Sequence, residues 1–218
     1  MPNEQEATAD IAAQDSDQEN EVDAKAEKIS ADVVDVCEII DADGKVIKKI
    51  SLKNGVPHGA TVIFDENGAV SHRLNFVNGI LEGPAEFFEG EKSLMTTNFK
   101  DGVQEGEAVF FSNGIKSSTV CFKNGLFDGV FTSFDGAGNV MRVANYVEGK
   151  QQGECQLFYP DGALLEHSLY ENNLINGEVK KYYQDGSLME ISCFENGKPC
   201  GTVDFFDNAG NLLSSCEV

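Results

Sequence analysis

The sequence predicts an all-β fold, an elongated single-layer antiparallel sheet of stacked β-hairpins, preceded by a disordered acidic tail. Three observations predict it. A motif recurs every 23 or 24 residues, glycine-containing turns occupy two fixed places in each copy, and the segments between turns are short and rich in Val, Ile, Thr, Phe and Tyr. A period of this length is typical of repeat architectures, in which each unit packs on its neighbours.

Each copy of the motif opens with an apolar or aromatic residue, here called the opening position. The seven opening residues are Leu52, Phe76, Phe99, Phe122, Tyr146, Tyr170 and Phe194. Two residues later, six copies continue with Asn-Gly, Asp-Gly or Glu-Gly, and the sixth copy has Asn173 in place of the glycine. Type I′ hairpin turns need positive φ at both central positions, which Gly and Asn tolerate best. The sequence therefore predicts a hairpin turn at this point in every copy.

Two further positions recur in all seven copies. A second glycine follows the turn, at Gly59, Gly83, Gly106, Gly129, Gly153, Gly177 and Gly201. Twelve residues after the opening position lies an aromatic residue, and these residues are called the aromatic column: Phe64, Phe88, Phe111, Phe134, Phe158, Tyr182 and Phe206. A second turn follows, as in Asp161-Gly162. We expect the aromatic column to be the core that joins adjacent hairpins, each buried ring contributing about 1.5–3 kcal/mol.

The N-terminal segment differs from the repeats in composition. Residues 1–36 contain 11 acidic and 2 basic residues and no aromatic residue, and they carry −9 of the chain's net charge of −21. Such a segment cannot bury enough apolar surface to offset its ordering entropy. We therefore expect a disordered acidic tail over residues 1–32 and one repeat domain of about eight hairpins over residues 33–218.

The repeat unit resembles that of a known family. The residues YVEG at 146–149, with Gly153 and then LFYPDG at 157–162, are similar to the MORN repeat, and more closely to its bacterial variant form. The resemblance covers about residues 36–218. It implies hairpins stacked into a twisted antiparallel sheet, protein–protein contact, sometimes membrane association, and an antitoxin role in some bacterial members. It assigns none of these roles to particular residues.

Five aromatic residues adjoin the aromatic column and are candidates for contact with a partner. They are Phe87, Phe110, Tyr159, Tyr183 and Phe205. Because successive side chains of a strand point to opposite faces, these five should point away from the column. We expect them to form a contact strip for a protein partner. The alternative is that twist and neighbouring loops shield them.

The last strand is a second candidate for contact. The segment from Leu212 to Val218 has Glu217 as its one charged side chain. A terminal strand presents unpaired backbone groups, which can pair with another chain. We therefore expect a protein partner or a second copy to dock at this edge, with Leu213 in the contact. The alternative is that the strand is a short cap.

The motifs of common enzymes and cofactor sites are absent from the sequence. It contains no HExxH, GxSxG, P-loop, GxGxxG or EF-hand spacing, and its three histidines occupy different phases of the repeat. We therefore expect a non-enzymatic protein-interaction or scaffold protein, with no catalytic residue, metal site or cofactor. The alternatives are an antitoxin-like neutraliser of a basic toxin and a membrane-associated module.

The acidity of the chain bears on its partners and location. A net charge of −21 opposes nucleic acid and anionic membranes and favours a basic protein. The six cysteines show no CxxC spacing, and neither a Sec signal peptide nor a transmembrane segment is visible. We therefore expect reduced thiols and a cytoplasmic location, with export by a signal-less specialised route as the alternative.

Overall fold

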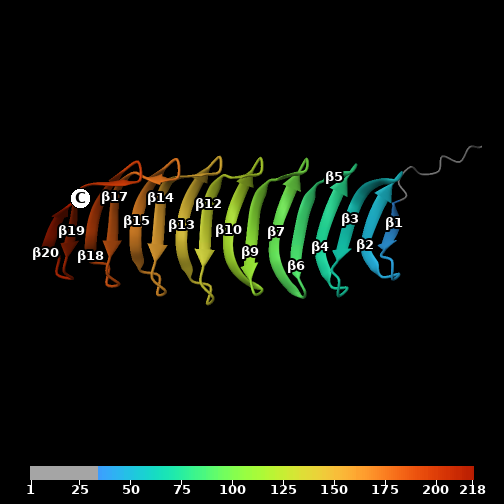
Figure 1. Ribbon diagram of the computed structural model, residues 1–218, viewed down its shortest axis with the longest axis horizontal. Coiled ribbons are helices and arrows are strands. Elements are labelled where there is room, and N and C mark those ends of the chain that lie inside the picture. Colours follow the sequence, from blue (N-terminus) through green and yellow to red (C-terminus); the bar gives the residue numbers. More distant parts are fainter. Residues whose placement is uncertain (1–33) are drawn as a thin grey trace, which may run out of the picture. The chain divides into compact units, whose positions relative to one another are not determined.

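The computed structural model describes residues 34–218, and all regular structure within them is β-strand. The chain divides into two units, Met1–Asp32 and Val33–Val218. The predicted acidic tail lies outside the described residues. Every described strand pairing is antiparallel and belongs to one open sheet. The predicted fold class, an all-β single-layer sheet of hairpins, is confirmed (Figure 1).

The strands follow one another across the sheet in chain order, because each pairs with the strands next to it in sequence. Their bounds are β1 (Asp35–Ile40), β2 (Val46–Lys53), β3 (Val56–Phe64), β4 (Val70–Val77), β5 (Ile80–Leu81), β6 (Gly83–Glu89), β7 (Lys92–Lys100), β8 (Val103–Gln104), β9 (Gly106–Ser112), β10 (Ile115–Lys123), β11 (Leu126–Phe127), β12 (Gly129–Phe134), β13 (Val140–Val147), β14 (Lys150–Phe158), β15 (Leu164–Glu171), β16 (Leu174–Ile175), β17 (Gly177–Tyr182), β18 (Leu188–Glu195), β19 (Lys198–Phe206) and β20 (Leu212–Glu217).

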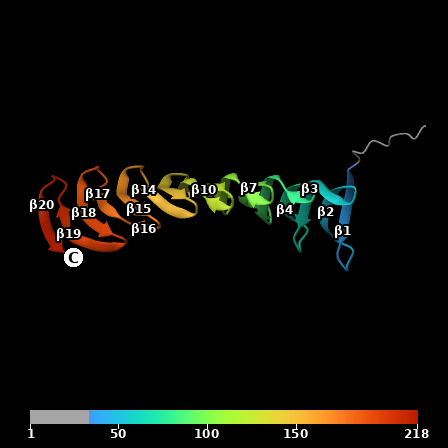
Figure 2. The ribbon, with the colours of Figure 1, turned by 90° about the horizontal axis from the view of Figure 1, so that it is seen from above.

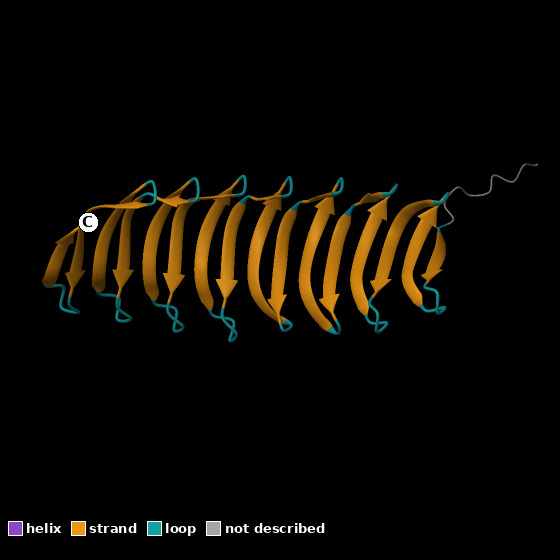
Figure 3. Cartoon of the chain, in the orientation of Figure 1, coloured by secondary structure: helices purple, strands orange, loops and turns teal. Residues whose placement is uncertain are grey.

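Turns lie along both long edges of the sheet (Figure 3). At one edge, each opening position leads into a two-residue turn with positive φ, for example Asn124 at 51° and Gly125 at 76°. Asn173, which replaces glycine in the sixth copy, has a φ of 71°. The predicted hairpin turns and the role of Asn173 are therefore confirmed.

At the other edge, an aspartate organises most of the turns. Asp135 Oδ1 accepts hydrogen bonds from the backbone N–H groups of Ala137, at 2.9 Å, and Asn139, at 2.8 Å. Asp207 makes the same bonds with Ala209 and Asn211. A short side chain that accepts bonds from the following backbone is a common way to close a turn.

A register shift immediately precedes the aromatic column in all seven copies. In β12 and β13, Ser133 pairs with Arg142 but Phe134 pairs with Val140, so Met141 is an extra residue. The same shift separates Phe110 from Phe111, which face Ser118 and Lys116. A bulge of this kind bends the strand and raises its local twist, and the strands of this sheet bend visibly (Figure 2).

The most buried side chains form a row of mostly small residues across one face, here called the buried row. Its members with less than a tenth of their surface exposed are Ile50, Thr61, Ala85, Thr97, Ala108, Val120, Ala144, Cys155, Ser168, Val179 and Ser192. They face one another across strands, as Ala108 and Val120 do. All seven aromatic-column residues, by contrast, are half-buried. The prediction that the aromatic column forms the core is therefore wrong.

Larger side chains cover the buried row. Phe110, Phe127 and Phe131 pack against the cluster of Ala108, Val120 and Phe122. Phe122 meets Phe127 edge-to-face, with ring centroids 5.0 Å apart. In a single layer no second sheet can exclude water, so dry positions arise where small residues lie beneath flanking rings.

Candidate interaction site

The hairpins are joined along the edge that carries the opening turns. In the first six copies, the residue before the second glycine accepts a hydrogen bond from the opening turn of the next copy. Glu82 Oε2 accepts the N–H of Asp101 at 2.7 Å, and Glu105 Oε2 accepts that of Asn124 at 2.9 Å. His58, Asp128, Gln152 and Asn176 do the same for the turns that begin at Asn78, Glu148, Asn172 and Asn196. These six residues are called the acceptor column.

Sequence reasoning missed the acceptor column, although a signal was present. The position before the second glycine holds a polar side chain with a hydrogen-bond acceptor in the first six copies. A backbone bond accompanies each of these six contacts, as from Gly102 N–H to the carbonyl of Leu81 at 2.9 Å. The acceptor column thus joins neighbouring repeats along the edge of the opening turns, and its side-chain acceptors already have hydrogen-bond partners within the sheet.

Two of the five candidate aromatics lie on the face of the buried row, because Phe87 and Phe110 are two residues from Ala85 and Ala108 in their strands. All five are half-buried. Phe87 packs edge-to-face on His72, with centroids 5.1 Å apart, and Phe110 packs on the core cluster. These two rings therefore have structural roles within the sheet.

The two tyrosines of the strip join consecutive repeats. Tyr159 Oη donates to the carbonyl oxygen of Tyr182 at 2.9 Å, and Tyr183 Oη donates to that of Phe206 at 2.8 Å. Four of the five candidate aromatics thus have contacts within the sheet, and Phe205 is half-buried as well. Contact of these residues with a partner stays a prediction, and their internal use favours the shielded alternative.

The strand β20 contrasts with this strip, because all six of its residues are exposed. Among the described residues, β20 pairs with β19 alone. Leu213 is the extra residue of the bulge, since Phe206 faces Leu212 and Phe205 faces Ser214. Leu213 has 64% of its surface exposed. Among the large hydrophobic residues of the described chain, only Val36 of β1 exposes a larger fraction, 66%.

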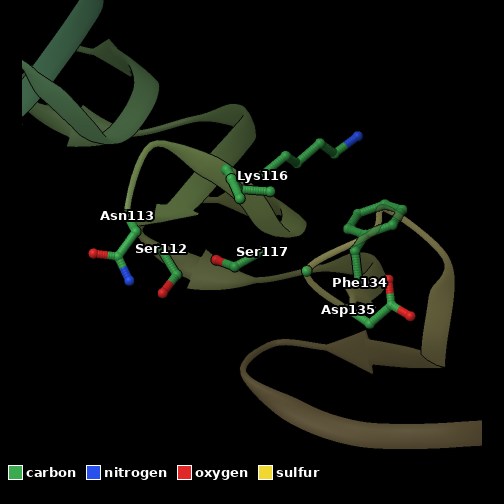
Figure 4. Close-up of a pocket in the computed structure, with 8 residues that line it drawn as sticks. Ser112, Asn113, Lys116, Ser117, Phe134 and Asp135 are labelled. Carbon is green, nitrogen blue, oxygen red and sulfur yellow. The ribbon is translucent and has the colours of Figure 1, made fainter.

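A shallow hollow lies between the fourth and fifth hairpins, at the edge of the aspartate turns (Figure 4). Its volume is about 290 Å³, and its lining includes Ser117, Phe134 and Asp135. The ammonium group of Lys116 lies 4.4 Å from the centroid of the Phe134 ring. The polar side chains here are exposed or half-buried, so they do not require a ligand.

A polar cluster interrupts the buried face in the fifth repeat. Arg142 donates to Gln151 Oε1 at 2.8 Å and to Cys155 Sγ at 3.4 Å. Burial, which alone would lower the pKa of Arg142, is outweighed by its interactions with Cys155 and Tyr146, which raise it. The guanidinium is therefore a fixed cation that already has partners within the sheet, and we assign it a structural role.

No group of three or more His, Cys, Asp or Glu side chains between residues 34 and 218 is placed to hold a metal ion. Within the same residues, no helix is long and apolar enough to cross a membrane.

Comparison with known proteins identifies the repeat. The family model described as MORN repeat variant matches residues 151–172 and 175–198. These two segments are consecutive repeats, running from β14 through the start of β19. The resemblance to the variant MORN repeat is therefore confirmed. None of the curated proteins compared with the chain matches it.

Proposed function

We propose that the chain is a non-enzymatic protein-interaction module whose open edge at β20 accepts an extended segment of a partner protein. MORN repeats commonly serve as protein- or membrane-interaction modules. The observation that carries the proposal is the exposure of all six residues of β20, which pairs on one side only among the described strands. A partner strand that adds to such an edge gains main-chain hydrogen bonds and pockets for alternate side chains.

The side chains of β20 support this choice of edge. Leu212, Leu213 and Val218 each expose more than half of their surface. Natural sheets blunt free edges with charged residues, and β20 contains Glu217 alone. The opposite terminal strand, β1, is also exposed but follows residues 1–34, which contain 10 acidic residues. That charge opposes strand addition by acidic segments, whereas β20 has no such neighbour among the described residues.

The test is a pull-down from the native host, in which wild-type protein, Leu213→Lys and Met141→Lys each serve as bait. Met141 is the matched control, because it is the extra residue of the equivalent bulge in an internal hairpin and is 49% exposed. We expect bait carrying Leu213→Lys to lose the proteins that wild-type bait captures from the native host, while Met141→Lys retains them. Circular dichroism should show the same β-sheet spectrum for all three proteins.

Self-association is measured in parallel by sedimentation. If wild-type protein dimerises and Leu213→Lys does not, the occupant of the edge is a second copy of the chain. Equal capture by all three baits, with monomeric wild-type protein, would show that β20 is not the docking site.

The charge of the chain supports a second candidate function, neutralisation of a basic protein such as a toxin. Residues beyond the acidic segment still carry −12 of the net charge of −21. Attraction between exposed charges is screened over about 8–10 Å at ordinary salt and steers association mainly through the on-rate. Capture that falls steeply as salt rises, with little effect of Leu213→Lys, would favour this function over docking at the edge.

A further inference from the structure

The opening turn at Asn196 and Gly197 joins β18 and β19 in a hairpin that brings two thiols together. Cys193 of β18 and Cys200 of β19 are directly opposite in the antiparallel register. The Cys200 thiol donates a hydrogen bond to Cys193, and the two sulfurs lie 2.7 Å apart. Both side chains are half-buried and both thiols are free. The sequence does not reveal this pair, because Cys200 is seven residues from Cys193 and shares no phase with it.

The backbone of this hairpin is already suitable for a disulfide. Directly opposite residues in an antiparallel pair have Cα atoms about 4.5 or 5.5 Å apart, and disulfides span Cα separations of about 4.4–6.8 Å. The pairs Glu195–Lys198 and Phe194–Pro199 hold the two strands in register between the turn and the cysteines. Bond formation therefore needs a small approach of the two sulfurs and no rearrangement of the strands.

Comparison of the repeats sets this pair apart. Cys200 occupies the position of the acceptor column, where the other six copies hold a polar acceptor. Cys121 occupies the position of Cys193 in the fourth copy, but the position of Cys200 in that copy holds Asp128, whose N–H donates to the Cys121 carbonyl oxygen. The seventh copy is thus the one in which both positions are cysteine.

We propose that Cys193 and Cys200 form a redox modification site, which a low-molecular-weight disulfide such as oxidised glutathione converts to an intramolecular disulfide. The Cys193 thiolate attacks one sulfur of the oxidant, forming a mixed disulfide and releasing one glutathione thiolate. Cys200 loses its proton to solvent and attacks the Cys193 sulfur, which releases the second glutathione. The two protein thiols lose two electrons and two protons, and the oxidant's disulfide is reduced to two thiols.

The order of attack follows from the hydrogen bond. The bond to Cys193, together with desolvation, raises the pKa of Cys200 to about 11. Cys200 therefore keeps its proton while Cys193 attacks. Once Cys193 is in the mixed disulfide, its thiolate no longer holds that proton, so the main cause of the raised pKa is removed and Cys200 can complete the exchange.

The test treats the full chain with oxidised glutathione and maps its disulfides by mass spectrometry. Cleavage after Glu195 separates the two cysteines, so their peptides stay joined only if the bridge has formed. We expect the joined peptides in wild-type protein, with the loss of two hydrogen atoms, and their separation after treatment with dithiothreitol. Cys193→Ser and Cys200→Ser should lose the bridge and accumulate glutathione on the remaining cysteine of the pair.

Cys121→Ser is the matched control and should form the bridge as wild type does. Asp128→Cys supplies the missing partner of Cys121 and should create a second bridge in the fourth repeat. Persistent glutathione adducts on both Cys193 and Cys200 of folded wild-type protein, or a bridge that joins either of them to another cysteine, would overturn the proposal. Circular dichroism of each variant verifies that the sheet is intact.

Discussion

In most opening turns the glycine serves two purposes. Positive φ alone requires a residue such as Gly or Asn. In several copies an exposed aliphatic side chain of the preceding copy also packs against the glycine. A Cβ added at Gly125 would lie 3.1 Å from Val103 Cγ1, and one added at Gly79 would lie 3.3 Å from Val56 Cγ1.

The exception at Asn173 fits this account. The preceding hairpin presents Lys150 at the position where Val103 and Val56 stand in their copies. Lys150 is flexible, and its ammonium group lies 3.5 Å from Asn172 Oδ1. The Asn173 side chain accepts the N–H of Gln151 at 2.6 Å. Glycine is therefore dispensable here, because no branched aliphatic group packs on the turn.

Alanine substitution of two of these glycines separates the cost of positive φ from the cost of crowding the neighbouring aliphatic side chain. Gly125→Ala should lower the free energy of unfolding by about 1–3 kcal/mol, the range for a strained backbone position. Gly55→Ala is the control, because its φ of 78° is nearly the same as that of Gly125 but no atom lies within 4 Å of an added Cβ. Urea unfolding should show the larger loss for Gly125→Ala. Equal losses would mean that the contact with Val103 contributes nothing.

The aspartate turns make stability depend on acidity. The Asn139 side chain holds the pKa of Asp135 below its ordinary value of 3.8, and the Asn211 side chain does so for Asp207. A carboxyl whose pKa is lower when folded stabilises the fold fully above its ordinary pKa. That contribution is lost as pH falls through the lower, folded pKa.

We therefore expect the free energy of unfolding to be flat above about pH 5 and to fall as the pH drops below about 4. Urea unfolding at a series of pH values measures this. Asp207→Asn keeps an acceptor oxygen but cannot titrate, so it should reduce the slope on the acid side. A slope unchanged in that variant would assign the acid sensitivity to other carboxyl groups.

At the scale of the hairpin, the important element is the bulge before the aromatic column. A shift of one residue exchanges the two faces of a strand. Up to Ser133, successive side chains of β12 alternate between the two faces of the sheet. The bulge between Ser133 and Phe134 interrupts this alternation, so the face of Phe134 does not follow from counting along the strand. In the fourth copy the opening position supplies the better-buried ring, because Phe122 is 9% exposed while Phe134 is half-buried.

Two alanine variants test which ring belongs to the core. Phe122→Ala should cost about 3–5 kcal/mol, the usual range for a buried aromatic. Phe134→Ala should cost less, because its ring is half-buried and is covered in part by Lys116. Chemical denaturation of both variants measures the difference. A greater loss from Phe134→Ala would restore the aromatic column as the core.

At the scale of the whole molecule, stability comes from contacts between neighbouring hairpins. The acceptor column and the tyrosine hydroxyls of Tyr159 and Tyr183 each join one repeat to the next. In such an architecture the free energy of unfolding is approximately a sum of repeat terms and nearest-neighbour terms. Every described hairpin is formed by strands that lie within residues 34–218.

Removal of residues 1–32 should therefore leave the melting temperature of the remaining chain nearly unchanged. The segment that would be removed is rich in acidic residues and lacks the aromatic residues of a core. Thermal unfolding followed by circular dichroism compares the two chains. A large fall in melting temperature would mean that the acidic segment stabilises the sheet.

The sequence by itself determined the all-β class, the hairpin repeat, the turns with positive φ and the place of Asn173, because each depends on residues close together in the chain. It did not determine which side chains are buried. A bulge before each aromatic-column residue changes the facing, and strand alternation alone cannot locate it. The tertiary structure also decided the internal roles of Phe87, Phe110, Tyr159 and Tyr183 and the pairing of Cys193 with Cys200. These depend on which atoms meet across strands and between repeats, and the register of the folded sheet sets that.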